Sequence, residues 1–499
     1  MKIKEILVNC NLMEFLGDKD LDIAMLAFDS REVKENTLFF AVRGTQSDGH
    51  DYIEKAIENG AIAVVCERLP EARHEGVSYI RVDNSALVLG VAAANFHDNP
   101  SRKLKLTGVT GTNGKTTIAT LLYRLFTDAG FSCGLLSTIE NIVDRERIPA
   151  THTTPDPIEL NSLLKRMVDH GCEYAFMEVS SHAVDQHRIA GLHFAGGIFT
   201  NLTHDHLDYH KTMANYRNAK KKFFDDLPAD AFALTNLDDR NGSVMLQNTK
   251  ARKMTYALKH DADFKGMVLE SHFDGMLMKV NGTEMFTRLV GNFNASNILA
   301  IYGAATALGF KKEELLMEIS KLQSANGRFN MVYGDNGVIG IIDYAHTPDA
   351  LGNVLRTINE VMKTENGKRK TENSHLSPLT SHLITVVGCG GNRDTTKRPE
   401  MAAVAVRLSN RVILTSDNPR NEEPEEIIRQ MREGVKEEGR GKVLSITDRR
   451  EAIRTAVALA HKGDIILIAG KGHEDYQIIK GEKRHFDDKE ELINALKEQ

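Results

Sequence analysis

Residues 110–117 read TGTNGKTT, in which glycine, lysine and threonine have the spacing of a phosphate-binding loop. Apolar residues over 104–109 predict a short buried strand before the loop, and apolar residues at helical spacing predict a helix from Thr116 until Gly130. A strand, a loop and a helix N-terminus present backbone N–H groups and a helix dipole to one anion. In such a loop Lys115 reaches the β and γ phosphates and the Thr116 hydroxyl binds Mg²⁺. We therefore expect an ATP or GTP site here.

The loop differs from the usual pattern at one position, because Val109 stands where a glycine normally lies six residues before the lysine. Gly111 is the nearer glycine. A glycine-rich turn that only joins a strand to a helix is the alternative, and the GKTT ending favours the nucleotide site.

Composition limits the class of protein. A chain of 499 residues predicts about three domains of roughly 150 residues. The net charge of -6 gives no basic field for nucleic acid or a membrane surface. Five cysteines without CxxC spacing favour a reducing compartment, and neither an apolar run of ~18 residues nor a signal peptide is present. We expect a soluble cytoplasmic protein.

The pattern of strands and helices predicts the α/β class with mostly parallel sheets. Residues 1–103 form a small α/β unit that ends in the linker-like HDNPSRK, residues 104–330 repeat strand and helix around the loop, and residues 331–499 begin a further doubly wound unit. The polar stretch 363–382 predicts a surface loop or a disordered insertion.

Two predicted strands, within 174–182 and 196–210, run into polar residues at their carboxyl ends, where ligands lie in open parallel sheets. These polar residues are Glu178, Ser180, His182, His204, Asp205, His206 and Asp208. The HDH tripeptide permits a zinc site. The absence of a further His/Asp cluster, together with the upstream loop, favours Mg²⁺.

Three other features are compatible with ordinary structural roles. Ser30 precedes a predicted strand and suits either a ligand contact or an ordinary polar loop. The lysine run 220–222 normally marks a solvated helix face. Asn294 and Asn297 start a predicted helix and suit either capping or contact with a base.

The motifs together resemble the Mur ligases. The resemblance covers essentially the whole chain and is carried, in order, by TGTNGKTT, MEVSSH, TNLTHDHLDYH, GNFNASN, GRF, DYAHTPDAL, GCGGNRD, SDNPR and GKGHE. The family implies ATP-dependent amide formation in peptidoglycan synthesis through an acyl phosphate. It also implies a UDP-sugar substrate-binding domain (1–103), a central P-loop ATP-binding domain (104–330) and a C-terminal Rossmann-like amino-acid-binding domain (331–499).

The resemblance implies roles for single residues. ATP contacts are implied for Gly111, Thr112, Asn113, Gly114, Lys115, Thr116, Thr117, Asn294, Arg328 and Asp343. One Mg²⁺ is implied at Thr116 and Glu178 and a second at His206 and a carbamylated Lys220, so that the catalytic set is Lys115, Glu178, His206 and Lys220. UDP-muramoyl dipeptide contacts are implied for Ser30, Thr153, Thr154, Ser180, Gln186 and Arg188. Contacts to the incoming amino acid are implied for Arg393, Asp417, Asn418, Pro419, Arg420, Gly470 and Glu474.

The expected amino acid is meso-diaminopimelate. It carries a distal carboxylate that lysine lacks, and a guanidinium such as that of Arg420 binds a carboxylate through two parallel hydrogen bonds. The same reaction with L-lysine, a folylpolyglutamate-synthetase-like ligase and a non-catalytic P-loop regulator are the alternatives. We expect a monomer. The sequence departs from the family at Asn330, where an acidic residue is expected, and in the length of 363–382.

Overall fold

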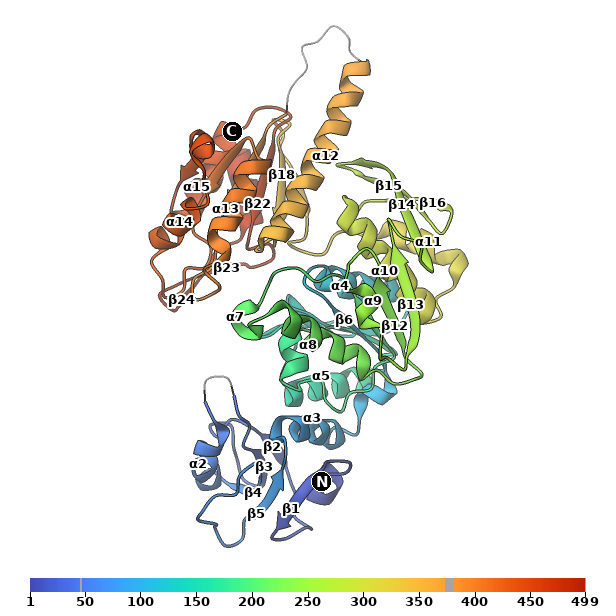
Figure 1. Ribbon diagram of the computed structural model, residues 1–499, viewed down its shortest axis with the longest axis vertical. Helices are drawn as coiled ribbons and strands as arrows, with labels where there is room; N and C mark the ends of the chain where they lie inside the picture. The colour runs from blue at the N-terminus through green and yellow to red at the C-terminus, as the bar shows by residue number, and fades with distance from the viewer. Residues whose placement is uncertain (45–46, 373–380, 499) are drawn as a thin grey trace.

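The computed structural model describes residues 1–44, 47–372 and 381–498, with the side chains of 366–372 left out. Three α/β parts follow one another along the long axis, from the blue N-terminal part at the bottom of Figure 1 to the orange and red C-terminal part at the top. Each part contains its own sheet, and most neighbouring strands within the sheets are parallel. The predicted α/β class is therefore confirmed.

The N-terminal sheet has the order β1-β5-β4-β3-β2, in which only β1 runs antiparallel to its neighbour. Its strands are β1 (Leu12–Leu16), β2 (Met25–Ala27), β3 (Thr37–Phe40), β4 (Ala61–Cys66) and β5 (Ser78–Val82). Its helices are α1 (Ile3–Ile6), α2 (Ile53–Glu58) and α3 (Ser85–Phe96), with 3₁₀ turns at Gly49–Tyr52 and Pro100–Lys103.

The central sheet has the order β16-β15-β14-β13-β12-β11-β6-β10-β7-β8-β9, parallel from β14 to β7 and antiparallel at both ends. Its strands are β6 (Lys105–Thr110), β7 (Cys133–Leu136), β8 (Glu140–Val143), β9 (Glu146–Pro149), β10 (Tyr174–Glu178), β11 (Gly196–Phe199), β12 (Phe232–Asn236), β13 (Arg252–Ala257), β14 (Phe264–His272), β15 (Gly275–Val280) and β16 (Thr283–Thr287). Its helices are α4 (Lys115–Asp128), α5 (Pro157–Asp169), α6 (Ser181–Asp185), α7 (Leu207–His210), α8 (Met213–Asp225), α9 (Gly242–Met245), α10 (Asn292–Ala307) and α11 (Lys312–Lys321).

Strand β6 lies in the middle of the central sheet and contributes side chains to the hydrophobic cores on both faces of that sheet. Val109 packs with α4 and α10 on one face, and Leu106 packs with α5 and α8 on the other, because successive side chains of a strand point to opposite faces. A Cβ at Gly108 would lie 2.7 Å from the Phe223 ring. The glycine therefore lets α8 approach β6 closely, and this approach brings Lys220 to the end of the strand.

The C-terminal sheet has the order β17-β18-β22-β19-β20-β21, with only β17 antiparallel. Its strands are β17 (Asn330–Tyr333), β18 (Ile339–Asp343), β19 (Leu383–Val387), β20 (Arg411–Leu414), β21 (Val443–Ser445) and β22 (Ile465–Ala469), followed by the hairpin β23 (Tyr476–Ile479) and β24 (Glu482–His485). Its helices are α12 (Pro348–Glu372), α13 (Lys397–Leu408), α14 (Pro424–Arg432), α15 (Arg449–Leu459) and α16 (Asp488–Lys497), with a 3₁₀ turn at Glu437–Lys442.

The predicted loop at 363–382 is wrong over its first half, because α12 continues to Glu372 and projects beyond the sheet (Figure 1). Lysine, glutamate and arginine are good helix formers, so a polar stretch that follows a buried helix can extend it into solvent. The extension contacts the central sheet, because Oε1 of Glu365 lies 3.0 Å from Nδ1 of His272 on β14. Residues 373–380 lie outside the described residues.

No helix in the described part of the chain is both long enough and apolar enough to cross a membrane.

Candidate active site

The glycine-rich loop between β6 and α4 is held by the end of β11. The backbone N–H groups of Thr112 and Asn113 donate to the carbonyl and the Oδ1 of Asn201, at 2.8 and 2.9 Å. Gly111 has φ +149°, and a Cβ there would lie 1.9 Å from Thr200 Oγ1. Thr200 and Asn201 received no role from the sequence, although their place at the carboxyl end of a central strand was a usable signal.

Two lysine side chains meet at one carbonyl of this loop. Lys115 Nζ donates to the carbonyls of Gly111 and Thr112, at 3.0 and 2.9 Å, and Lys220 Nζ donates to the same Gly111 carbonyl at 2.9 Å. Lys220 is 1% exposed, and its Nζ lies 4.7 Å from the centre of the Tyr216 ring. Burial, reinforced by the nearby Lys115, lowers the pKa of Lys220 well below its usual value. The solvated-face interpretation is therefore wrong at Lys220.

Glu178 ends β10 beside this loop and is fully buried. Its Oε1 accepts a hydrogen bond from the backbone N–H of Thr138 at 2.8 Å, whereas its Oε2 is buried without a partner among the described residues. An unsatisfied buried oxygen costs about 1–3 kcal/mol, so this atom suits a bound cation. The described residues contain no group of three or more His, Cys, Asp or Glu side chains arranged around a metal position, and the zinc alternative gains no support.

His206, which follows the same sheet edge, has a left-handed backbone with φ +54°. Its ring lies 5.0 Å from the ring of His182 and 6.0 Å from that of Tyr216. The structure thus brings His206 to the neighbourhood of Tyr216 and Lys220.

Residues from the end of the central part and from the C-terminal part reach the loop from its other side. Arg328 Nη2 donates to Thr116 Oγ1 at 2.9 Å, and its guanidinium lies 4.5 Å from the centre of the Tyr344 ring. Asp343 accepts from the backbone N–H groups of Phe329 and Ala345, at 2.7 and 2.8 Å, and burial raises its pKa to about 6.

The two predicted asparagines of α10 are buried next to the same loop. The helix begins after Gly291, so neither residue is its N-cap. Asn294 Nδ2 donates to the Val290 carbonyl at 2.9 Å, and Asn297 Nδ2 donates to Asn294 Oδ1 at 3.2 Å. A Cβ at Gly114 would lie 2.8 Å from Asn297 Oδ1, so this glycine allows α10 to touch the loop. Asn330, the departure noted in the sequence, accepts a hydrogen bond from the backbone N–H of Gly327.

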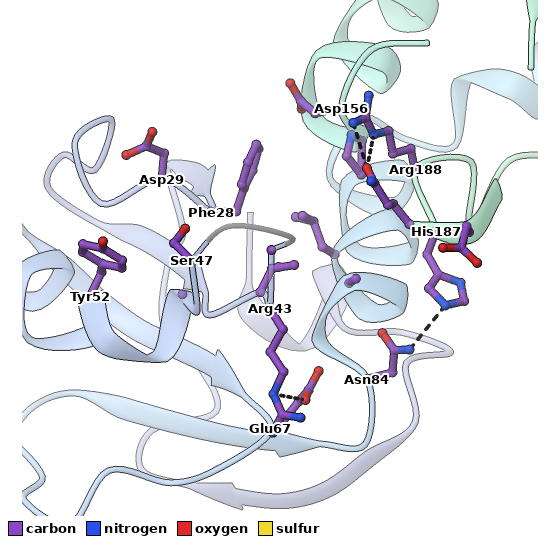
Figure 2. Close-up of a pocket in the computed structure, with 18 of the residues that line it drawn as sticks. Phe28, Asp29, Arg43, Ser47, Tyr52, Glu67, Asn84, Asp156, His187 and Arg188 are labelled. Atoms are coloured by element: carbon purple, nitrogen blue, oxygen red, sulfur yellow. Dashed lines mark hydrogen bonds and ion pairs between the residues drawn. The ribbon is translucent and has the colours of Figure 1, made fainter. Parts of the chain in front are cut away.

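A cavity of about 910 Å³ separates the N-terminal part from the central part, and Ser30, Gln186 and Arg188 line it. Figure 2 shows Arg188 on the central side of this cavity, opposite the loop that carries Phe28 and Asp29. Arg188 donates to Gln186 Oε1 at 2.8 and 3.0 Å and to the Thr154 carbonyl at 2.9 Å.

Threonines next to the cavity link Arg188 to the end of β10, where Glu178 lies. Thr154 Oγ1 donates to the Glu178 carbonyl at 2.9 Å and accepts from the Ser180 backbone N–H at 3.2 Å. The Thr153 hydroxyl accepts from Thr138 Oγ1 at 3.1 Å. Hydrogen bonds therefore run from Arg188 through Thr154 to the backbone carbonyl of Glu178, and from Thr153 through Thr138 to the Glu178 carboxylate.

The predicted amino-acid residues gather at the carboxyl ends of β20 and β22. Asn418 Nδ2 donates to Glu474 Oε2 at 2.7 Å. A Cβ at Gly470, with φ +119°, would lie 2.6 Å from Asp417 Oδ2, so only glycine fits there. Burial, followed by the nearby Asp417, raises the pKa of Glu474.

Arg420 and Arg393 lie on adjacent loops of this cluster. Arg420 Nη1 donates to the Gly391 carbonyl at 2.8 Å, and a Cβ at Gly390 would lie 2.9 Å from the same nitrogen. The same Cβ would lie 3.8 Å from Cγ of the exposed Arg393. A Cβ at Gly391 would lie 1.9 Å from the Pro419 carbonyl oxygen, so the two loops pack tightly.

The fold and the site define a P-loop nucleotide-binding α/β protein with a ligand cavity on one side of the loop and a cluster of ionic side chains on the other. The sequence matches the Mur ligase family, catalytic domain, over residues 22–97, the Mur ligase middle domain over 109–305, and the Mur ligase, glutamate ligase domain, over 327–472. The chain belongs to the Mur ligase family.

Individual relatives are similar in sequence to this chain over its whole length. It is 57% identical over 492 residues to the UDP-N-acetylmuramoyl-L-alanyl-D-glutamate–2,6-diaminopimelate ligase of Bacteroides fragilis. The aligned region covers 99% of this chain and 98% of that relative. It is 40% identical over 506 residues to the ligase of the same name from Clostridium tetani, with both chains fully covered.

Solved structures show the same fold. A structure of a UDP-N-acetylmuramoyl-L-alanyl-D-glutamate–2,6-diaminopimelate ligase matches with TM-score 0.68 and 32% identity, over 100% of this chain and 99% of the other. A Mycobacterium tuberculosis folylpolyglutamate synthase complexed with ADP matches with TM-score 0.58 and 17% identity, over 77% of this chain and 92% of the other. The second likeness concerns the fold alone.

Proposed function

We propose that this chain is the ligase that uses ATP to join meso-diaminopimelate to UDP-N-acetylmuramoyl-L-alanyl-D-glutamate in peptidoglycan synthesis. The observation that carries the proposal is 57% identity, over essentially the full length of both chains, to a ligase of that name. The folylpolyglutamate-synthetase-like alternative is weaker, because its structure covers only 77% of this chain at 17% identity.

The proposed division of labour follows the three parts. Residues 1–103 and the neighbouring cavity wall take the UDP-muramoyl dipeptide, with contacts from Ser30, Thr153, Thr154, Ser180, Gln186 and Arg188. Residues 104–330 take ATP on the loop 111–117, helped by Asn294, Arg328 and Asp343. Residues 331–499 take the amino acid through Arg393, Asp417, Asn418, Pro419, Arg420, Gly470 and Glu474. The central part, which carries β6, the loop and α4, lies between the N-terminal and C-terminal parts in Figure 1, and this arrangement supports the division.

The chemistry begins with a carboxylate, which is a poor acyl donor because oxide would have to leave. The γ-phosphoryl group of ATP is therefore transferred to the γ-carboxylate of the D-glutamyl residue, giving an acyl phosphate and ADP. Lys115 and the backbone N–H groups of the loop stabilise the charge on the transferred group. The neutral amine then attacks the acyl carbon and the C–N bond forms. The bond from the acyl carbon to the bridging oxygen breaks, so that phosphate leaves with that oxygen, and the nitrogen gives up one proton to the departing phosphate or to solvent.

The residues around the loop fit a magnesium ion. The unpartnered Glu178 Oε2 and the Thr116 hydroxyl are oxygen donors of the kind Mg²⁺ prefers, and we propose His206 and a carbamylated Lys220 for a second ion. Carbamylation adds CO₂ to a neutral amine with loss of a proton, and the low pKa of buried Lys220 supplies that amine. Bound Mg²⁺ would neutralise phosphate charge during transfer.

We also propose that the enzyme acts as a monomer in the cytoplasm. The proposed site residues all come from one chain, so a second copy is not required to complete the site. The five cysteines are free thiols, as a reducing compartment favours.

The direct test is phosphate release by the purified protein with ATP, Mg²⁺, the UDP-muramoyl dipeptide and one amino acid. We expect release with meso-diaminopimelate and none when the amino acid is omitted. Release with L-lysine at equal efficiency would contradict the specificity, and release that needs glutamate and a folate would support the alternative ligase. ATP binding without turnover on any of these substrates would support a non-catalytic regulator.

A further inference from the structure

The amino-acid cluster contains a buried lysine that has no role in the proposal above. Lys471 follows Gly470 and is 0% exposed. Its Nζ lies 3.4 Å from Glu474 Oε2, donates to the Tyr476 carbonyl, and lies 5.4 Å from the centre of the Tyr476 ring. Burial of an ammonium group is costly unless an anion pairs with it, so the contact with Glu474 explains why this lysine is buried.

Lys471 and a second donor hold the same oxygen of Glu474. Asn418 Nδ2 donates to Oε2 at 2.7 Å, and Lys471 Nζ lies 3.4 Å from that atom. Within the described residues, Glu474 Oε1 has no hydrogen-bond partner. The carboxylate is thus fixed through one oxygen while the other stays available to an incoming cation or N–H donor.

The other charged groups near Glu474 do not replace Lys471. Asp417 is a like charge, which raises the pKa of Glu474 together with burial, whereas Lys471 opposes that rise. Arg449 acts on Glu474 from α15, but its guanidinium is committed to Asp488 through two contacts of 2.7 Å. Two phenols also face the carboxyl, those of Tyr344 and Tyr476.

We propose that Lys471 is a positioning residue for ligation, which keeps the Glu474 carboxylate ionised and aims its free oxygen at the amine of the incoming amino acid. This inference rests on the proposed function and adds to it the residue that sets the state of the amine-binding carboxylate. Without Lys471, the negative charges of the buried Asp417 and the partly buried Glu474 are less well compensated, and the Glu474 carboxyl takes up a proton at higher pH. A protonated carboxyl no longer accepts an ionic hydrogen bond from the amine.

The test compares Lys471→Met with Lys483→Met in the full-length enzyme. Lys483 is the matched control, because its Nζ lies 4.0 Å from the centre of the same Tyr476 ring but on the exposed strand β24. We expect Lys471→Met to raise KM for diaminopimelate about ten- to hundredfold, the loss of one charge-assisted contact, with KM for ATP and for the dipeptide unchanged. We also expect the acid limb of kcat/KM against pH to move to higher pH. Lys483→Met should match wild type.

Acyl phosphate formation without the amino acid, trapped with hydroxylamine, reports whether Lys471→Met is folded. Normal trapping of the acyl phosphate, together with a raised KM for diaminopimelate and an acid limb of kcat/KM displaced to higher pH, supports the proposal. Loss of trapping means that the lysine is merely structural and overturns it, as does behaviour equal to that of Lys483→Met. Glu474→Gln is an independent variant: the part of the acid limb that comes from Glu474 should be lost, leaving only protonation of the substrate amine, and an unchanged limb overturns the proposal.

The proposed function is tested by the wild-type enzyme alone, and it is refuted if that enzyme does not use diaminopimelate. A wild-type enzyme that uses diaminopimelate while Lys471→Met behaves as wild type leaves the function intact and removes only this inference.

Discussion

Replacement of Arg420 by lysine tests how the enzyme distinguishes diaminopimelate from lysine. In the structure Arg420 Nη1 is already used, because it donates to the Gly391 carbonyl at 2.8 Å and lies 3.5 Å from the Asn418 carbonyl. Among the described residues, Nε and Nη2 have no partner. These two nitrogens form the edge of the guanidinium that can hold a carboxylate through two parallel hydrogen bonds.

The expected magnitude follows from those two free donors. A hydrogen bond to a charged group contributes about 1.5–3 kcal/mol, and an ammonium group cannot reproduce the planar fork. Loss of the pair should therefore cost about 3 kcal/mol or more, which corresponds to roughly a hundredfold or larger fall in kcat/KM for diaminopimelate.

The assay is steady-state phosphate release at fixed ATP and dipeptide, with either diaminopimelate or L-lysine as the varied substrate. We expect Arg420→Lys to lose efficiency with diaminopimelate and to change little with L-lysine, so that the preference between them collapses. Arg484→Lys is the control, since Arg484 lies exposed on β24 and pairs with Glu482. Equal losses with both amino acids, or no loss with diaminopimelate, would refute the assignment of Arg420 to the distal carboxylate.

Three further changes have defined outcomes. Lys220→Ala should lower kcat by about 10²–10³-fold by removing the carbamate, with partial recovery on addition of short carboxylates; full activity of the variant in the phosphate assay would exclude the carbamate. Gly111→Ala should lower kcat/KM for ATP about 10²-fold or more, because its Cβ would lie 1.9 Å from Thr200 Oγ1; an unchanged value would contradict the tight loop. Arg449→Met should reduce the free energy of unfolding in urea by about 3–5 kcal/mol, since it leaves Asp488 buried without its partner; a loss below 1 kcal/mol would mean that Asp488 is compensated elsewhere.

The loop and its flanking elements were predictable because their signals are local. Apolar spacing and the glycines defined a strand and a helix around residues 111–114, and the structure has β6 end at Thr110 and α4 begin at Lys115. The mostly parallel sheets followed from the same local pattern repeated along the chain.

Features set by tertiary packing were harder to predict. Nothing in the run 220–222 shows which lysine is buried, because that depends on α8 lying against Gly108 of β6. The resemblance to the family singled out Lys220, but the pattern alone predicted a solvated face. The sequence also does not show that Lys471 is buried, or that its neighbour Glu474 is held by Asn418, which lies 56 residues away.

The extension of α12 shows a different limit. The polarity of residues 363–372 predicts a loop, but the high helix propensity of these residues and the buried helical turns before them extend α12 instead.

The most direct test of the central claim follows the carboxyl oxygens of the dipeptide. The D-glutamyl γ-carboxylate is labelled with ¹⁸O, one turnover with ATP and diaminopimelate is allowed, and the released phosphate is analysed by mass spectrometry. Transfer of the γ-phosphoryl group to that carboxylate predicts that one labelled oxygen appears in each phosphate released. Phosphate without label would contradict the acyl phosphate, and with it the role proposed for Lys115 and the loop.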